Sequence, residues 1–373
     1  MKGPGSNLTM KFSLVPALLG ILISLAGPLK AHEIPNDTTS SERIERSMPV
    51  DPRASITLCV VSGTLTVRGW DKNEVRARST DADQIDFRRV DRAKDTTTPA
   101  TRVDVMVVVK HGPKGDCQSL ADVEMDVPKD ATVQVQTRDG DIYITGVAGA
   151  YAGSQNGDIV IERASKFVEA GVVGGSISLK DSTGRINLSS AGGGVDVHNV
   201  RPVNPDDGID VGTVSGDIQL EHVTNQKLTA KTVNGTISMT GALSKTGQYA
   251  FTTMGGDVIL AMPRDASFTL NARVSEKGDI VSDFPLKYLP EVPPPAAPKA
   301  DPVPKSAPKS KVTPAPKTPP TSGPSKPGPV IAPIVVVKPV IVNPFRRFTA
   351  VCGNGDATIT LSSFGGTLHL KRM

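Results

Sequence analysis

The sequence predicts an all-β fold, a β-solenoid in which short strands wind into stacked coils. The first observation is a Gly-Asp-Ile phrase that recurs at 140–142, 157–159 and 216–218. The second is the spacing of the equivalent glycines, roughly 17 to 23 residues, which is typical of solenoids. The third is that frequent Gly and β-branched residues leave no i, i+3, i+4 pattern over a helix-length window. The aligned glycines are Gly140, Gly157, Gly175, Gly193, Gly216, Gly235, Gly256 and Gly278.

Each repeat carries two strands, one on each side of the glycine. Before it, inward-type and outward-type residues alternate, as in 133–137 and 186–190, and such alternation predicts a half-buried strand. After it a second alternation follows, with inward-type residues such as Ile142 and Ile144. Glycine permits the tight turn between the strands because it reaches positive φ without steric cost. Since parallel crossovers favour one hand, we expect a right-handed, parallel β-helix-like coil.

The N-terminus has the layout of a secretory signal. Lys11 precedes an apolar run at 12–26, and Ala31 fits the last residue of a cleaved leader. We therefore expect a signal peptide at 1–31 and a polar, flexible leader at 32–52. The alternative is an uncleaved membrane anchor, for which the run is short against the roughly 20 residues of a membrane span.

Order is expected to begin near Ile56, and the main solenoid to occupy 53–289. Residues 56–67 fit the whole repeat template and form an isolated first coil. Apolar alternation at 102–110 and at 121–127 predicts two antiparallel strands joined by a Gly/Pro loop. The N-terminal part of the solenoid is therefore expected to be an antiparallel β region.

Several phrases around the repeats resemble those of a known family. They are Gly-Trp-Asp at 69–71, the entry phrase at 126–131, Asp-Phe-Pro-Leu at 283–286 and the closing Gly-Asn-Gly-Asp at 353–356. With the serial Gly-Asp-Ile coils, they look like the bacterial putative adhesin domain over about 56–370, minus one insertion. This resemblance implies a β-solenoid and a surface or periplasmic location. It brings no catalytic, cofactor-binding or metal-binding residues.

Residues 290–344 depart from the family pattern because they are rich in Pro, Ala, Lys, Ser and Thr. Such a segment cannot bury a core, so we expect a disordered or polyproline II insertion that is locally basic. It would reach across the envelope, contact anionic cell-wall polymer or lipid headgroups, or be a tolerated surface-loop insertion. The template resumes at 348–359 and at 359–370, so 345–373 is predicted to form the final solenoid coils.

Acidic residues that follow the turn glycines are one candidate site. Because strands stack about 4.8 Å apart, their carboxylates would form a partial column that could share a Ca²⁺ ion. The competing interpretation is that Asp suits the turns and accepts local backbone N–H groups. It is favoured because Ser176, Gly194 and Thr236 interrupt the column. The column comprises Asp141, Asp158, Asp217, Asp257, Asp279 and Asp356.

Catalysis has little support in the sequence. The histidines share no spacing with a nucleophile, and no His-x-x-x-His pair, Cys-x-x-Cys pair or phosphate loop occurs. Aromatic residues make up only 4% of the chain, so the stacking platforms of a sugar cleft are scarce. We therefore predict no enzyme activity and assign no catalytic, cofactor-binding or metal residue. The histidines are His32, His111, His198, His222 and His369.

Three cysteines make an odd count for an exported protein, where disulfides form. A bridge from Cys59 to Cys117 would leave Cys352 free, although the sequence does not choose the pairing. Cys352 falls on an inward-type position, where it would serve as a small buried apolar residue.

The sequence as a whole predicts an exported, non-enzymatic envelope β-solenoid in the periplasm or on the cell surface, acting as an adhesin or envelope-binding scaffold. Its expected partner is an envelope polymer or surface protein. The near balance of 42 Lys+Arg and 38 Asp+Glu gives no indication of nucleic acid, and no membrane span is expected after leader cleavage. The alternatives are a carbohydrate-active β-helix enzyme, a lyase or hydrolase, and a component of an envelope-stress sensor.

The repeat template makes a testable statement about Ile218. Replacement by Asp would place a charge among stacked aliphatic side chains, at a cost of more than about 4 kcal/mol. We expect Ile218→Asp to prevent folding of the middle coils, as measured by thermal unfolding. A wild-type melting curve would contradict the inward assignment.

Overall fold

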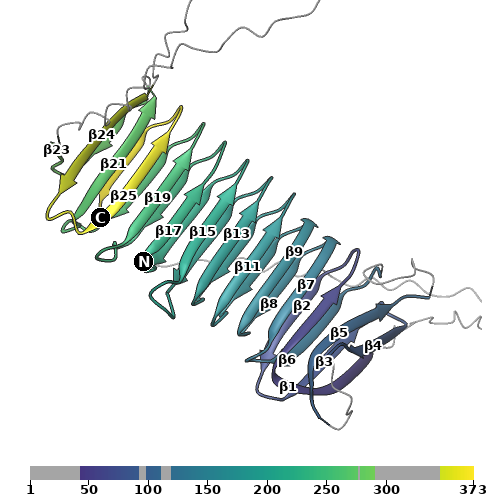
Figure 1. The fold of residues 1–373 in the computed structure, drawn as a ribbon. Coiled ribbons are helices and arrows are strands. Elements are labelled where there is room, and N and C mark those ends of the chain that lie inside the picture. The colour runs from purple at the N-terminus through teal and green to yellow at the C-terminus, as the bar shows by residue number, and fades with distance from the viewer. Residues whose placement is uncertain (1–42, 92–97, 111–118, 276–277, 290–344) are drawn as a thin grey trace, which may run out of the picture. The chain divides into compact units, whose positions relative to one another are not determined.

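Alternating residues fold into strands along the whole described chain, which confirms the all-β solenoid. The described residues form 26 strands and no helix. The predicted signal peptide at 1–31 and the Pro-rich segment at 290–344 lie outside them. The computed structural model describes residues 43–91, 98–110, 119–275, 278–289 and 345–373 (Figure 1).

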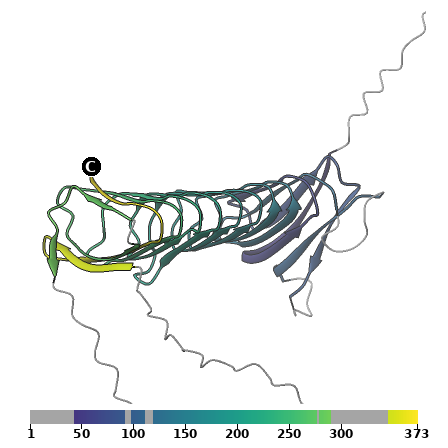
Figure 2. The same ribbon diagram turned by 90° about the horizontal axis from the view of Figure 1, so that it is seen from above.

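The strands form two sheets, A and B, and the chain passes from one to the other and back in each coil (Figure 2). Strand β1 (Ile44–Cys59) pairs in both sheets, so all 26 strands belong to one pairing network. In order of pairing, sheet A comprises β1, β3 (Glu74–Ser79), β6 (Val123–Pro128), β2 (Leu65–Trp70), β8 (Ile142–Thr145), β10 (Ile159–Glu162), β12 (Ile177–Lys180), β14 (Val195–Val200), β16 (Ile218–Val223), β18 (Ile237–Thr240), β20 (Val258–Met262), β26 (Leu368–Arg372) and β22 (Ile280–Ser282).

Sheet B holds the other strand of each coil, followed at each end by antiparallel strands. In order of pairing it comprises β4 (Gln84–Arg89), β5 (Ala100–Val108), β1, β7 (Thr132–Asp139), β9 (Gly149–Asn156), β11 (Phe167–Val172), β13 (Arg185–Ser190), β15 (Gly208–Thr213), β17 (Lys227–Lys231), β19 (Gln248–Thr253), β25 (Ala357–Ser363), β21 (Phe268–Ser275), β24 (Phe345–Cys352) and β23 (Lys287–Leu289).

The core consists of columns of apolar side chains, because parallel strands in matched register stack equivalent residues. Ile159 pairs with Ile142 on one side and Ile177 on the other, and all three are 0% exposed. Ile218 is also completely buried, as the repeat template predicts. Matched burial along the stack lets neighbouring coils supply the apolar contacts that a single coil lacks.

The tight turns form a glycine ladder. A Cβ placed on Gly175 would lie closer than 3.0 Å to the carbonyl oxygen of Gly157, a separation that real Cβ atoms essentially never show. The backbone approach is less close at Gly278, where an added Cβ would lie 3.1 Å from the carbonyl oxygen of Gly366. The ladder proper comprises Gly63, Gly140, Gly157, Gly175, Gly193, Gly216, Gly235, Gly256 and Gly366.

A row of buried hydroxyl groups supports this ladder, and sequence reasoning missed it. The Oγ of Ser190 donates to the carbonyl of Gly175 at 2.8 Å and accepts the N–H of Gly193 at 3.0 Å. A hydroxyl residue three positions before the glycine therefore satisfies polar backbone groups of two coils. The residues that donate to a ladder glycine of the neighbouring coil are Ser154, Ser190, Thr213, Thr232, Thr253 and Ser363.

The first coil in the sequence is not the outermost coil in space. Strand β5 pairs in parallel with β1, and β6 pairs in parallel with β2, so β5 and β6 form a coil outside the first one. The prediction that 102–110 and 121–127 are antiparallel to each other is therefore wrong, because the alternation did not reveal the pairing partners. Strands β3 and β4 supply the antiparallel pairing instead.

The C-terminal end shows the same interleaving. The last coil, β25 with β26, lies between the β19–β20 coil and the β21–β22 coil, although it follows both in sequence (Figure 1). The coil predicted at 348–359 is wrong, since β24 runs antiparallel to β21. Gly353 and Gly355 have φ of 63° and 76°, and the chain turns between β24 and β25 at these residues.

The described strands bear on two of the predicted segment boundaries. The leader predicted at 32–52 is wrong at its end, because Met48 pairs with Val75 of β3 and Val50 is buried. Pairing with β3 satisfies the backbone of this segment and orders it. At the other end, Leu289 of β23 pairs with Thr349 of β24, so the residues that flank 290–344 belong to paired strands of one sheet. If 290–344 is an insertion within one domain, the strands on its two sides must belong to the same domain, and the β23–β24 pairing meets that condition.

The glycine ladder predicts a sharp difference between two Gly→Ala variants. Gly175→Ala would force the backbones of adjacent coils apart, and we expect it to lower the free energy of unfolding by about 3 kcal/mol. The matched control is Gly212→Ala on β15, where the nearest atom would lie 4.0 Å from the added methyl group, so little change is expected. Chemical denaturation measures both, and equal stability of the two variants would contradict the ladder.

Candidate functional site

The acidic turn residues act as acceptors between coils. Asp141 Oδ1 accepts the backbone N–H of Asp158 at 2.8 Å, and Asp158 Oδ1 accepts that of Ser176 at 2.8 Å. The backbone role expected for Asp is therefore correct, but the N–H belongs to the next coil and not to the same turn. The same bond, at 2.7 Å, joins Asp217 to Thr236 and Asp257 to Thr367.

Asp356 does not belong to this column, contrary to the sequence pattern. It follows the turn between β24 and β25, where its backbone N–H donates to Ser267 Oγ at 3.3 Å. Asp279 follows the looser Gly278 near β22, and its carbonyl accepts the N–H of Leu368 at 2.9 Å. Among the described residues, no group of three or more His, Cys, Asp or Glu side chains is arranged to hold a metal ion.

The histidines and cysteines lie apart. His198 Nδ1 is 3.1 Å from Glu221 Oε2, His222 has a positive φ of 53°, and His369 lies on β26. His32, His111 and Cys117 lie outside the described residues. Cys59 is disulfide-bonded. Cys352 is a buried free thiol whose pKa is raised by that burial, which confirms its inward position.

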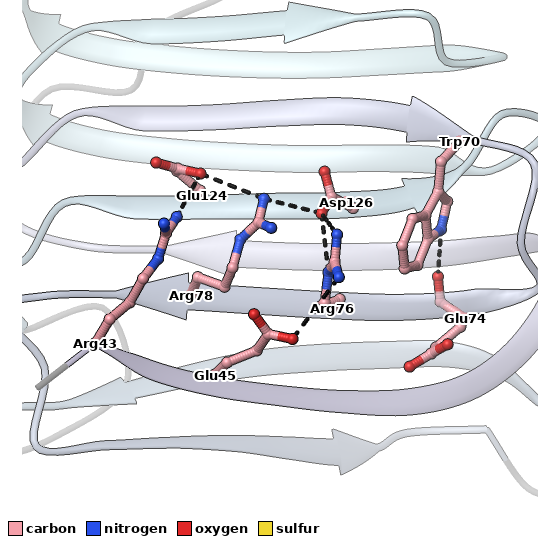
Figure 3. Close-up of polar contacts among 8 residues, drawn as sticks. All are labelled: Arg43, Glu45, Trp70, Glu74, Arg76, Arg78, Glu124 and Asp126. Carbon is pink, nitrogen blue, oxygen red and sulfur yellow. Dashed lines mark hydrogen bonds and ion pairs between the residues drawn. The ribbon is translucent and has the colours of Figure 1, made fainter.

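A charged cluster on sheet A fastens the N-terminal edge strands (Figure 3). Asp126 Oδ2 accepts from Arg76 at 2.8 Å and lies 2.9 Å from Arg78 Nη2. Its side chain is 9% exposed, and its hydrogen bond raises the pKa of Arg76. Arg78 Nη2 also lies 3.3 Å from Glu124, which accepts from Arg43 at 2.7 Å.

Trp70 completes this cluster. Its ring lies beneath the guanidinium of Arg76, 4.6 Å from the ring centroid, and its Nε1 donates to the carbonyl of Glu74 at 2.8 Å. Lys72 Nζ lies 4.8 Å from the same centroid. Arg76 Nη1 also lies 3.7 Å from Glu45 Oε1 on β1. Because these contacts join β1, β2, β3 and β6, the cluster holds the N-terminal edge strands in place, and we call it the edge lock.

A different surface has the features of a binding site. Two adjoining hollows of about 440 and 320 Å³ lie on the outer side of sheet B, and Glu169 and Asn187 line both. Together they form one shallow groove over β7, β9, β11, β13, β15 and β17. We call this surface the groove face.

The middle outward residue of each strand forms the central row of the groove face. In register, the row is Gln134, Tyr151, Glu169, Asn187, Asp210 and Thr229. The side chains of Glu169, Asn187 and Asp210 are exposed and make no hydrogen bond or ion pair within the part of the chain that the structure describes. Polar groups at strand spacing are thus left available to a ligand.

Tyr151, a member of this row, forms an aromatic pair with Phe167. The rings of Tyr151 and Phe167 are 5.0 Å apart, at an interplanar angle of 56°. Gly149 makes the position of Phe167 feasible, because a Cβ on Gly149 would come closer than 3.0 Å to that ring. Tyr151 remains 38% exposed, so one amphipathic ring is accessible among the polar residues of the row.

The segment at 201–207 lengthens one coil and contributes to the groove. Asp207 Oδ2 accepts the backbone N–H groups of Val203 and Asn204, at 2.9 and 2.7 Å, which fixes the turn. Asp206 accepts from Lys227 Nζ at 2.8 Å, and this bond lowers the pKa of Asp206. The groove thus has a charged wall beside β15 and β17.

Sequence reasoning assigned no site here, although the signal was present. Gln134 and Asn187 are outward-type positions of the strands that the alternation predicts at 133–137 and 186–190. Aligning successive coils on their glycines would have placed them in one row. The hollow itself depends on Phe167 and on the 201–207 segment, whose positions the repeat template does not specify.

The coils and their glycine turns can now be compared with known proteins. A family model described as Toastrack DUF4097 matches residues 72–290, more than half of the chain. The chain belongs to the Toastrack DUF4097 family. The match begins within the N-terminal edge of the Toastrack solenoid and ends where the Pro-rich segment starts. It supports the resemblance expected from the sequence and carries no enzymatic assignment.

Solved structures give two distant likenesses to this Toastrack chain. One is a putative adhesin from Parabacteroides merdae, at 11% identity and a TM-score of 0.39, covering 59% of this chain and 89% of that one. The other is a putative cell adhesion protein from Clostridium sporogenes, at 8% identity and a TM-score of 0.19, covering 89% of this chain and 100% of that one. No curated protein matches the sequence. In the described residues, no helix qualifies as a membrane span.

The edge lock of the Toastrack solenoid is testable through Asp126. Asp126→Ala would leave Arg76 and Arg78 beside each other without their shared counter-charge. We expect hydrogen exchange of the β3 amides to accelerate by about tenfold or more. The control is Asp71→Ala, which removes an exposed pair with Lys129 and should leave β3 protected. Unchanged exchange in Asp126→Ala would show that the cluster does not hold the edge.

Proposed function

We propose that this chain is an exported, non-enzymatic β-solenoid of the cell envelope, an adhesin or envelope-binding scaffold that binds its partner on the groove face. The observation that carries the proposal is the central row, where the side chains of Glu169, Asn187 and Asp210 are exposed, make no polar contact with any other described residue, and lie near the accessible ring of Tyr151. The rigid sheet beneath them holds these groups at fixed spacing, which reduces the entropy lost on binding.

Export is supported by the leader pattern at the N-terminus. An apolar run at 12–26 that follows Lys11 and precedes the cleavage-type residue Ala31 is the arrangement that secretory machinery recognises. The disulfide at Cys59 fits an oxidising compartment, because disulfides persist in secreted and periplasmic proteins. The periplasm and the cell surface both meet these conditions.

The runner-up is a carbohydrate-active enzyme, and one observation favours it. Glu169 and Asp210 lie in the same row two strands apart, which places their Cα atoms about 9 to 10 Å from each other. Inverting glycosidases hold two carboxyl groups about 6.5 to 9.5 Å apart. The binding role is preferred because both carboxylates stand exposed on a shallow face, where water screens the charges that catalysis would use.

The test is retention of the purified full chain by an envelope fraction from cells that produce it. We expect wild type to be retained, and Tyr151→Ala to weaken retention about tenfold because it removes the accessible ring. The matched control is Tyr143→Ala, which removes a tyrosine of similar exposure from sheet A, on the opposite side.

Two outcomes would contradict the proposal. One is that the envelope fraction does not retain the wild-type chain. The other is that the Tyr143→Ala and Tyr151→Ala variants lose retention to the same extent. Release of new reducing ends from the fraction, abolished by Glu169→Gln, would favour the enzyme instead.

A further inference from the structure

We propose that the ligand of the groove face is a neutral, hydroxyl-rich polysaccharide that lies across the strands. This inference rests on the proposed binding function and adds the chemical class of the partner. It follows from the position of the face within the sheet, from its charges and from its repeat spacing.

The position of the face excludes main-chain recognition of a peptide strand. Strands β9, β11, β13, β15 and β17 each pair with a parallel neighbour on both sides. Their backbone donors and acceptors are therefore engaged in the sheet, and β-strand addition needs a free edge. A ligand on this face must be recognised by side chains.

The charges of the groove disfavour a polyanion. Lys227 is already paired with Asp206, which leaves Arg185 as the remaining cation against Glu169 and Asp210 among the lining residues. A polymer rich in phosphate or carboxylate would bring like charges against this acidic excess. A neutral chain avoids that repulsion.

The chemistry of the row suits hydroxyl groups. Carboxylates accept hydrogen bonds, and the amides of Gln134 and Asn187 both donate and accept, which matches a ligand whose hydroxyls do both. The six residues of the row extend over five strand spacings, about 24 Å. A polymer of similar units can repeat the same contact from strand to strand.

The aromatic pair completes the recognition chemistry. Tyr151 is exposed beside Gln134 and Glu169, and its ring is held at 5.0 Å from Phe167. An aromatic face packs against the C–H face of a sugar ring, while neighbouring polar groups bond its hydroxyls. A ligand with both an apolar face and a hydroxyl rim fits this arrangement.

The experiment compares binding of the full chain to four preparations of the same envelope fraction: untreated, protease-digested, periodate-oxidised, and competed with glycans released from it. The released glycans are divided by anion exchange into neutral and acidic pools. We expect binding to survive protease, to fall at least tenfold after periodate, and to be competed by the neutral pool. The Tyr151→Ala and Asn187→Ala variants should each bind the untreated fraction about tenfold more weakly than the Tyr143→Ala variant. All three variants should give the circular dichroism spectrum of the wild-type chain.

Binding that is lost after protease but insensitive to periodate would overturn the glycan inference and leave the binding function standing, with a protein partner. Competition by the acidic pool alone would overturn the neutral class. No binding to the untreated fraction would overturn the proposed function itself, and this inference with it.

Discussion

The structure depends on the contact between the turn glycine of one coil and the carbonyl oxygen of the glycine in the next. At each step of the ladder, from Gly63 to Gly366, the backbones approach so closely that no Cβ fits between them. This approach brings the strands on both sides into pairing distance, and the hydroxyl row and the Asp acceptors then satisfy the remaining polar groups of the turn. The apolar columns follow from the register that the ladder imposes.

The repeat pattern in the sequence is sufficient to predict this local geometry. Gly140 or Gly175 marks the turn, and the alternation on each side identifies inward residues such as Ile218, because both signals are local in the chain. The order of coils at the ends is not predictable in this way. Residues 102–108 and 357–363 carry the same alternation as any other strand, and nothing within them specifies which coil they will contact. The direction of pairing likewise depends on two strands, so the local pattern at 348–359 predicts a coil, whereas β24 pairs antiparallel with β21.

The candidate binding face was hidden for a related reason. Its side chains belong to six different coils and become neighbours only when those coils are stacked in register. Alternate residues of each strand therefore have different roles. Inward residues hold the stack together, while outward residues can vary without cost to the core. Such a division lets a recognition surface change residue by residue on an unchanged scaffold.

The interleaved coils at both ends have a mechanical consequence. In a simple solenoid the first and last repeats have one neighbour each, so they fray first and expose the chain ends. Here the coil nearest each chain terminus has a neighbour on both sides, β5–β6 with β7–β8 at one end and β19–β20 with β21–β22 at the other. A pulling force that is transmitted to either of these two coils must therefore shear two coil interfaces at once. A chain tethered through both ends would keep these coils folded under a tension that would detach the terminal repeat of an ordinary stack.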